Sequence, residues 1–171
     1  ASSSGSLTFV DGTSDVVLDN TYKEYLFIFK HIHPQTDDQP LTFQANAAGG
    51  SGYDETLTTT YFRAYHTEAG SAGFGYDGNR DLAQSTDFQQ VISDIGNGND
   101  ECGSGFLHLF NPSSTTFVKH FICRTSSLSS GGAVQQHISG YFNTTSAIDE
   151  IQFKMASGNI DAGVIKLYGI S

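Results

Sequence analysis

The C-terminal segment 147–171 constrains the fold more than any other part of the chain. It opens with a strict alternation of apolar and polar residues over 150–155, the pattern of a strand with one buried and one solvated face. A stretch rich in Gly, Asn and Asp follows at 157–163, and such residues reverse the chain at low conformational cost. Alternation then resumes over 164–168. The pattern predicts a C-terminal β-hairpin that closes a core.

The alternation also indicates how the two arms of this hairpin pair. A shift of one residue would bring Lys166 beside Phe153 in the core, so the apolar pattern favours a single register. The expected cross-strand pairs are Met155 with Gly163, Phe153 with Ile165, and Ile151 with Leu167.

Short runs rich in β-branched and aromatic residues recur along the chain, with turn signals between them. Segment 25–33 is apolar on both faces over much of its length, which predicts a central strand. Segment 87–95 is the one candidate for a short helix, and 74–81 has the composition of a loop. Further strands are expected at 7–10, 41–45, 56–66, 106–110, 117–123 and 134–142.

These signals predict an all-β, jelly-roll-like antiparallel β-sandwich that forms a single domain over residues 7–171. A flexible, Ser-rich arm is expected at residues 1–6. Two cysteines are too few for a disulfide framework, and we expect both to be reduced.

A second hairpin is expected around the turn signal at 111–116. In the register that pairs Asn111 with Thr116, Cys102 and Cys123 share one face and lie diagonally close. The other expected pairs are Phe110 with Phe117, Phe106 with Phe121, and Leu109 with Val118.

The composition disfavours several classes of partner. The 171 residues carry a net charge of −10, which disfavours nucleic acid and anionic membranes because both repel an acidic protein. No apolar run approaches the roughly 20 residues that span a bilayer. The N-terminal residues lack the pattern of a signal peptide, so we expect synthesis in the cytoplasm without a secretory signal. Charged residues make up only 15%, against roughly 25% in an ordinary domain.

Two groups of residues have the chemistry of metal ligands. His31 and His33 are spaced to share one face of a strand, which suits a transition metal, although no further ligand lies nearby in sequence. Segment 77–81 begins like a calcium loop, but Leu82 occupies the position that requires glycine. The Gly-rich segment 94–101 offers oxygen ligands for calcium at Asp94, Asn97, Asn99, Asp100 and Glu101.

The simpler interpretation of both groups is solvated turns and structural histidines, so no cofactor is expected. The sequence also lacks a nucleophile elbow, a catalytic cysteine motif and a zinc-protease motif. Adjacent carboxylates such as Asp37 and Asp38 point to opposite faces of an extended chain. We therefore expect a protein that is not an enzyme.

Three strings resemble a β-module found in tailed bacteriophages, particularly those of marine bacteria. They are AYHTEAG at 64–70, NPSSTTFVKHF at 111–121 and YFNTTSAIDEIQFKMASGNIDAGVIKLYGI at 141–170. In those phages the module is a small virion protein or the terminal domain of a tail fibre. The resemblance implies a jelly-roll-like sandwich and a structural role in the virion, and it implies no ligand-binding residues.

Because only a Ser-rich segment precedes the module, the resemblance favours a capsid decoration or head-fibre protein on the virion exterior. Its implied partners are capsid or tail proteins and further copies of the chain, in a trimer or another homo-oligomer. One alternative is a tail-fibre component that recognises a host surface glycan. Another is a free carbohydrate-binding module, in which Tyr53, Tyr61, Tyr65 or Tyr76 would stack on sugars.

Overall fold

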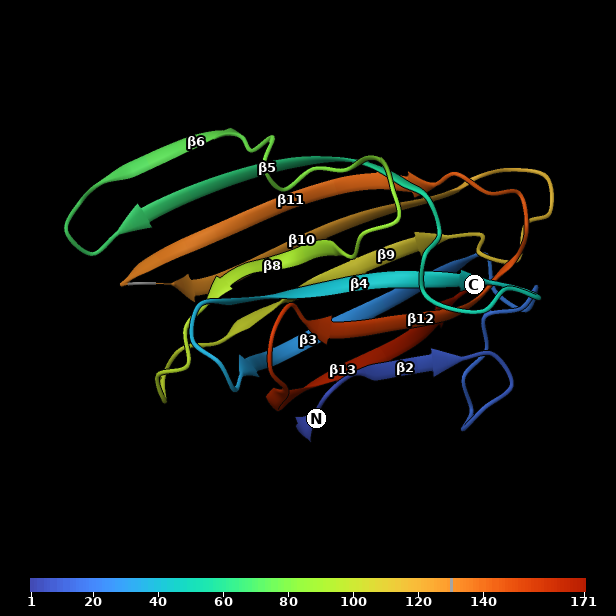
Figure 1. Ribbon diagram of the computed structural model, residues 1–171, viewed down its shortest axis with the longest axis horizontal. Coiled ribbons are helices and arrows are strands. Elements are labelled where there is room, and N and C mark those ends of the chain that lie inside the picture. The colour runs from blue at the N-terminus through green and yellow to red at the C-terminus, as the bar shows by residue number, and fades with distance from the viewer. Residues whose placement is uncertain (130) are drawn as a thin grey trace.

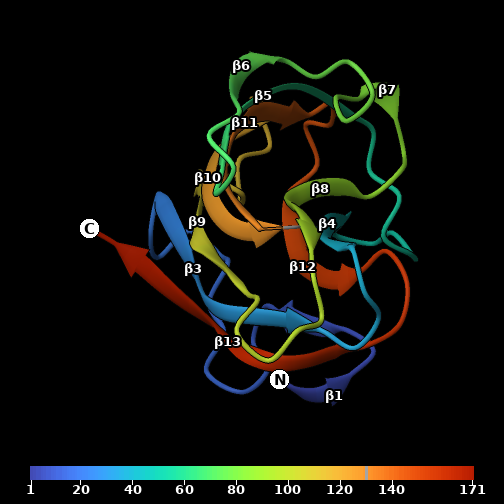
Figure 2. The ribbon, with the colours of Figure 1, turned by 90° about the vertical axis from the view of Figure 1, so that its left-hand side faces the viewer.

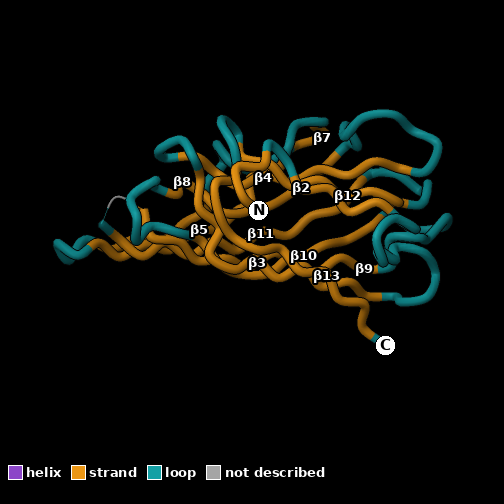
Figure 3. The backbone as a smooth tube through the Cα atoms, turned by 90° about the horizontal axis from the view of Figure 1, so that it is seen from below, coloured by secondary structure: helices purple, strands orange, loops and turns teal. Residues whose placement is uncertain are grey.

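The computed structural model describes residues 1–129 and 131–171, which form thirteen strands and no helix (Figure 3). Every strand pair is antiparallel. Sheet A has nine strands: β1 (Ser2–Ser4), β13 (Ile160–Ile170), β3 (Glu24–Pro34), β9 (Gly103–Phe110), β10 (Lys119–Ser129), β11 (Gly132–Phe142), β5 (Leu57–Thr67), β6 (Ala72–Tyr76) and, paired with β5, β7 (Ala83–Ser85). Sheet B has four: β2 (Leu7–Val10), β12 (Ile148–Met155), β4 (Gln39–Ala47) and β8 (Gln89–Ile95).

The two sheets pack face to face, and the predicted antiparallel β-sandwich is confirmed (Figure 1). Seen end-on, sheet A curves around strands β12, β4 and β8 of sheet B (Figure 2). Aromatic rings fill the space between the layers. Phe43 of sheet B lies 5.0 Å from the Phe121 ring of sheet A in an edge-to-face contact. None of the described residues belongs to a helix that is long and apolar enough to span a membrane.

Strand β3 is central, as its apolar composition predicts, because it lies between β13 and β9. Tyr25, Phe27 and Phe29 point into the core and are at most 2% exposed. The backbone of His31 then has a positive φ of 50°, and the register with β9 shifts there. This bulge places Ile32 in the core. Beyond it, the alternation of buried and exposed side chains is shifted by one residue.

The predicted C-terminal hairpin is wrong in its pairing. Strand β12 pairs with β2 and β4 in sheet B, whereas β13 pairs with β1 and β3 in sheet A. Residues 156–159 therefore cross from one sheet to the other instead of forming a tight turn. Ile151 and Phe153 are fully buried as the alternation predicts, but Ile165 reaches the same core from the opposite layer. The expected pairs of 151–155 with 163–167 do not form.

The second predicted hairpin joins the right strands in the wrong register. Strands β9 and β10 are neighbours, but Leu109 pairs with Phe121, and Phe106 pairs with Arg124. The connection is longer than expected because residues 111–118 all lie outside the strands. The leucines of β9, rather than its phenylalanines, point into the core, and Phe117 is 69% exposed in the connection.

Two local predictions are also wrong. Segment 87–95 forms strand β8 rather than a helix, and 74–81 contributes part of strand β6. The pairing of β8 with β4 contains two register shifts, so its buried residues do not follow a strict period of two. Irregular spacing of this kind resembles a helical pattern in sequence.

The N-terminal segment, expected as a flexible arm, supplies strand β1, which pairs with β13 at Ser2 and Ser4.

Candidate functional surfaces

Asp94 is separated from the other candidate calcium ligands because it belongs to a network of ion pairs. Its carboxylate lies 2.7 Å from Nη2 of Arg80 and 3.7 Å from Nη1 of Arg63. Both arginines also lie 3.1 Å, through Nε, from Oδ2 of Asp77. Four alternating charges thus join β5, β8 and the segment after β6. The calcium-like segment 77–81 is held by this network.

The remaining candidates lie in the segment that joins β8 to β9. The Glu101 carboxylate accepts a hydrogen bond from the backbone N–H of Gly98 at 2.9 Å, which closes the turn on itself. The backbone N–H of Asn97 donates to Asp37 at 3.1 Å. Asn99 and Asp100 are exposed. Asn97 and Glu101 therefore take part in holding the loop, whereas Asn99 and Asp100 face solvent.

The bulge in β3 brings His31 and His33 close to this loop. Nε2 of His33 lies 3.1 Å from the Gly98 carbonyl oxygen, and Nδ1 lies 3.8 Å from the Asp161 carboxylate. His31 is exposed and lines the same depression as His33, Asn99, Asp100 and Glu101. The structure thus brings the two sequence-predicted groups together. However, within residues 1–129 and 131–171, no three His, Cys, Asp or Glu side chains are arranged to hold a metal ion.

We expect the Asp94→Ala variant to lose roughly 1–3 kcal/mol of unfolding free energy, because two partly buried guanidinium groups lose a shared acceptor. Urea titrations with calcium and with a chelator should give the same loss. Asp100→Ala is the matched control, since Asp100 is exposed and should leave stability unchanged. A loss that appears only with calcium would show that Asp94 is a ligand.

The two cysteines are free and far from the predicted diagonal contact. Cys123 is 1% exposed, and burial raises the pKa of its thiol, which keeps it protonated and unreactive. The Cys102 carbonyl oxygen instead accepts a hydrogen bond from Leu128, five residues beyond Cys123 on β10. The shifted register of β9 and β10 explains this separation.

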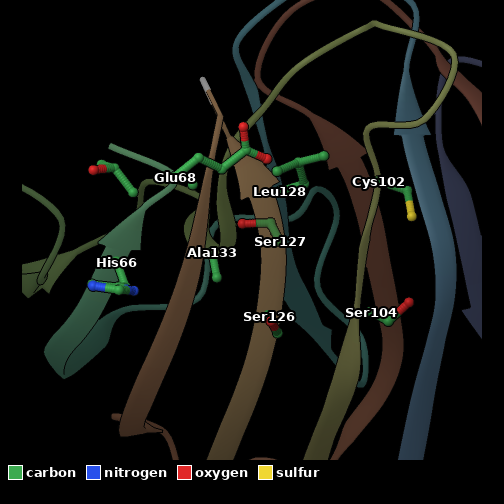
Figure 4. Close-up of a pocket in the computed structure, with 10 residues that line it drawn as sticks. His66, Glu68, Cys102, Ser104, Ser126, Ser127, Leu128 and Ala133 are labelled. Atoms are coloured by element: carbon green, nitrogen blue, oxygen red, sulfur yellow. The ribbon is translucent and has the colours of Figure 1, made fainter. Parts of the chain in front are cut away.

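A hollow of about 510 Å³ at one end of sheet A contains the residue types of a hydrolase (Figure 4). His66 and Glu68 lie on the β5 side, and the serines come from β9 and β10. Figure 4 shows His66 separated from Ser104 by the intervening strands. The Ser104 hydroxyl accepts from the His31 N–H, and Ser127 donates to the Ser93 carbonyl oxygen. Among the described residues of the hollow, no nucleophile is paired with a base.

The four tyrosines considered for sugar stacking divide into two pairs. Tyr61 is fully buried, and burial raises the pKa of its hydroxyl to about 12. Tyr53 donates to Glu150, and burial together with this bond raises its pKa to about 12. Tyr65 and Tyr76 are 40% and 51% exposed near the end of the β5–β6 pair. Of the four, these two are the most exposed, whereas Tyr53 is half-buried.

One face of sheet A points away from sheet B and is covered by no second layer of described residues; we call it the outer face. It is built by alternate residues of each strand, opposite to those in the core. Large apolar side chains stand exposed on it from one edge to the other: Phe62, Phe74, Tyr76, Ile122, Val164, Tyr168 and Ile170. Sequence reasoning missed this surface; its one partial signal was the apolar composition of both faces of segment 25–33, whose outward Leu26 and Ile28 are half-buried on it.

No family model, no curated protein and no solved structure matches this chain.

Proposed function

We propose that this chain is a non-enzymatic structural protein on the exterior of a bacteriophage virion, as a capsid decoration or head-fibre protein. The observation that carries the proposal is the outer face of sheet A. Large exposed apolar patches on a protein domain mark contact surfaces. Phe74 and Phe62 stack there with centroids 6.3 Å apart, yet Phe74 remains 76% exposed. A side chain of that kind is expected to be covered in an assembly.

The distribution of charge supports the same function. The chain has 18 acidic and 8 basic residues. Among the described residues that point outward from β5, β6, β9, β10 and β11, none is Asp or Glu. The acidic residues therefore lie elsewhere, where mutual repulsion keeps particles apart. Contact surfaces are depleted in charge at their centres, and among the described outward residues of these five strands Arg124 alone carries a permanent charge. Further copies of the chain and capsid or tail proteins are the expected partners.

Cryo-electron microscopy of the phage that encodes the chain tests this function. We expect density for the β-sandwich on the outside of the capsid, at a copy number set by the capsid symmetry. As a control, particles from a deletion mutant of the gene should lack that density. Purified particles that contain none of the chain would contradict the proposal.

A second candidate function, in a tail fibre or a free carbohydrate-binding module, is favoured by the groove at the end of the β5–β6 pair. The groove has a volume of about 340 Å³ and is lined by aromatic rings, two glycines and an Arg–Asp pair. Tyr65 offers a ring face, and Arg63 and Asp77 offer hydrogen bonds, which is the chemistry that holds a sugar. Density at the tail tip, together with binding to host surface polysaccharide, would support this candidate.

A further inference from the structure

A raised aromatic cluster stands at one edge of the outer face. Phe62 of β5 stacks on Phe74 of β6 and meets Tyr76 edge-to-face, with ring centroids 6.3 and 5.1 Å apart. The three side chains are 38%, 76% and 51% exposed. Rings that pack against one another and still face water form a rigid apolar projection, which costs little conformational entropy to bury.

A hollow lies beside this cluster on the same face. It has a volume of about 460 Å³ and a mostly apolar lining. Ile122 of β10 is 50% exposed in it, and Tyr141 and Phe110 stand on its walls. Thr60 lines the hollow from β5, only two residues before Phe62, so projection and hollow are separated by roughly 7 Å along one strand.

The structure assigns this part of the outer face to a two-fold contact between two copies of the chain. A projection next to a hollow is self-complementary when a two-fold axis passes between them, because each copy inserts its projection into the hollow of the other. The aromatic cluster (Phe62, Phe74 and Tyr76) would then pack against Ile122 of the second copy. This inference rests on the proposed function, since it names the partner that the outer face receives.

The area of this part of the outer face and its low content of charged side chains both suit a second copy of the chain. Five strands spaced by about 4.8 Å, each contributing about seven residues, give a flat contact of roughly 600 Å² per copy. Protruding side chains add to this area. That is close to the roughly 800 Å² per partner of a standard interface. Among the described outward residues of these five strands, none is Asp or Glu and only Arg124 carries a permanent charge, so a contact between two copies buries few charged groups. The Glu24 carboxylate of neighbouring β3 lies 2.9 Å from His108 of β9, at the margin of this area.

Sedimentation of the purified full chain tests the contact. We expect the wild-type chain to form a dimer, and Phe74→Glu or Ile122→Lys to weaken it at least tenfold. Mixing these two variants should restore dimers, because one contact then pairs opposite charges while the other keeps both native side chains. Phe117→Glu and Tyr168→Glu are matched controls. Phe117 lies in a connection and Tyr168 lies on β13, near the opposite side of sheet A, so both variants should remain dimeric.

Four outcomes would overturn the inference. They are a wild-type chain that stays monomeric up to about 0.5 mM, a variant mixture that stays monomeric, equal weakening by the two controls, and a closed trimer as the only assembly. Circular dichroism of each variant separates loss of contact from loss of fold. A monomeric chain that nevertheless decorates capsids would overturn this inference and leave the proposed function standing.

Discussion

The Phe153→Ala variant is expected to lose roughly 3–5 kcal/mol of unfolding free energy, the usual cost of truncating a buried phenylalanine. Phe153 is fully buried at the centre of the sandwich. Its ring lies 5.3 Å from the rings of Phe27 and Phe29 in sheet A and 6.0 Å from that of Phe43 in sheet B. Truncation would leave a cavity between two paired sheets, which cannot close around it without disturbing both ladders.

Urea unfolding followed by fluorescence of the tyrosines measures this loss, and thermal unfolding should show a fall of roughly 6–20 °C. Phe117→Ala is the matched control, since it removes the same atoms from a side chain that is 69% exposed. It should change stability by less than about 0.5 kcal/mol. Equal stabilities for the two variants would mean that Phe153 does not lie in the core.

The burial of Phe153 was predictable from sequence, whereas its strand partners were not. Alternation over 150–155 specifies which side chains face the core, because a strand presents successive residues to opposite sides. It contains no information about whether the next strand continues the same sheet or crosses to the other. In both arrangements Phe153 and Leu167 meet the same core. The pairing is decided by residues far away in sequence, at β2, β4 and β3.

The candidate sites show the same division between composition and geometry. Sequence shows that candidate oxygen ligands are concentrated at 94–101, but it does not show that Arg63, thirty-one residues earlier, lies beside Asp94 and holds it in an ion pair. It also does not show that the bulge at His31 turns this residue toward the same loop. The outer face was partly visible, since Tyr25 to His33 is apolar on both sides. Recognising it as exposed requires knowing that no second layer covers it.

After Phe153→Ala, the largest loss of stability is expected from adding a single methyl group at Gly163. The sequence assigns it to a hairpin turn, but it lies within β13, at the second of two register shifts in the pairing with β3. Its φ of +118° is a conformation that residues with a side chain rarely adopt. A Cβ there would stand 2.7 Å from the carbonyl oxygen of His31 and 2.9 Å from Cα of Ile32, and both are backbone atoms that rotation cannot move.

Gly163→Ala should therefore lose roughly 2–4 kcal/mol of unfolding free energy, since backbone strain and overpacking both act. Two matched variants separate these causes. Gly12 has a φ of +73° with open space around it, so Gly12→Ala carries strain alone and should cost about 1 kcal/mol. Gly75 has open space and no positive φ, so Gly75→Ala should be neutral. Urea titrations should rank the losses in that order. If Gly163→Ala is no worse than Gly12→Ala, strand β13 does not approach the bulge of β3 as closely as described.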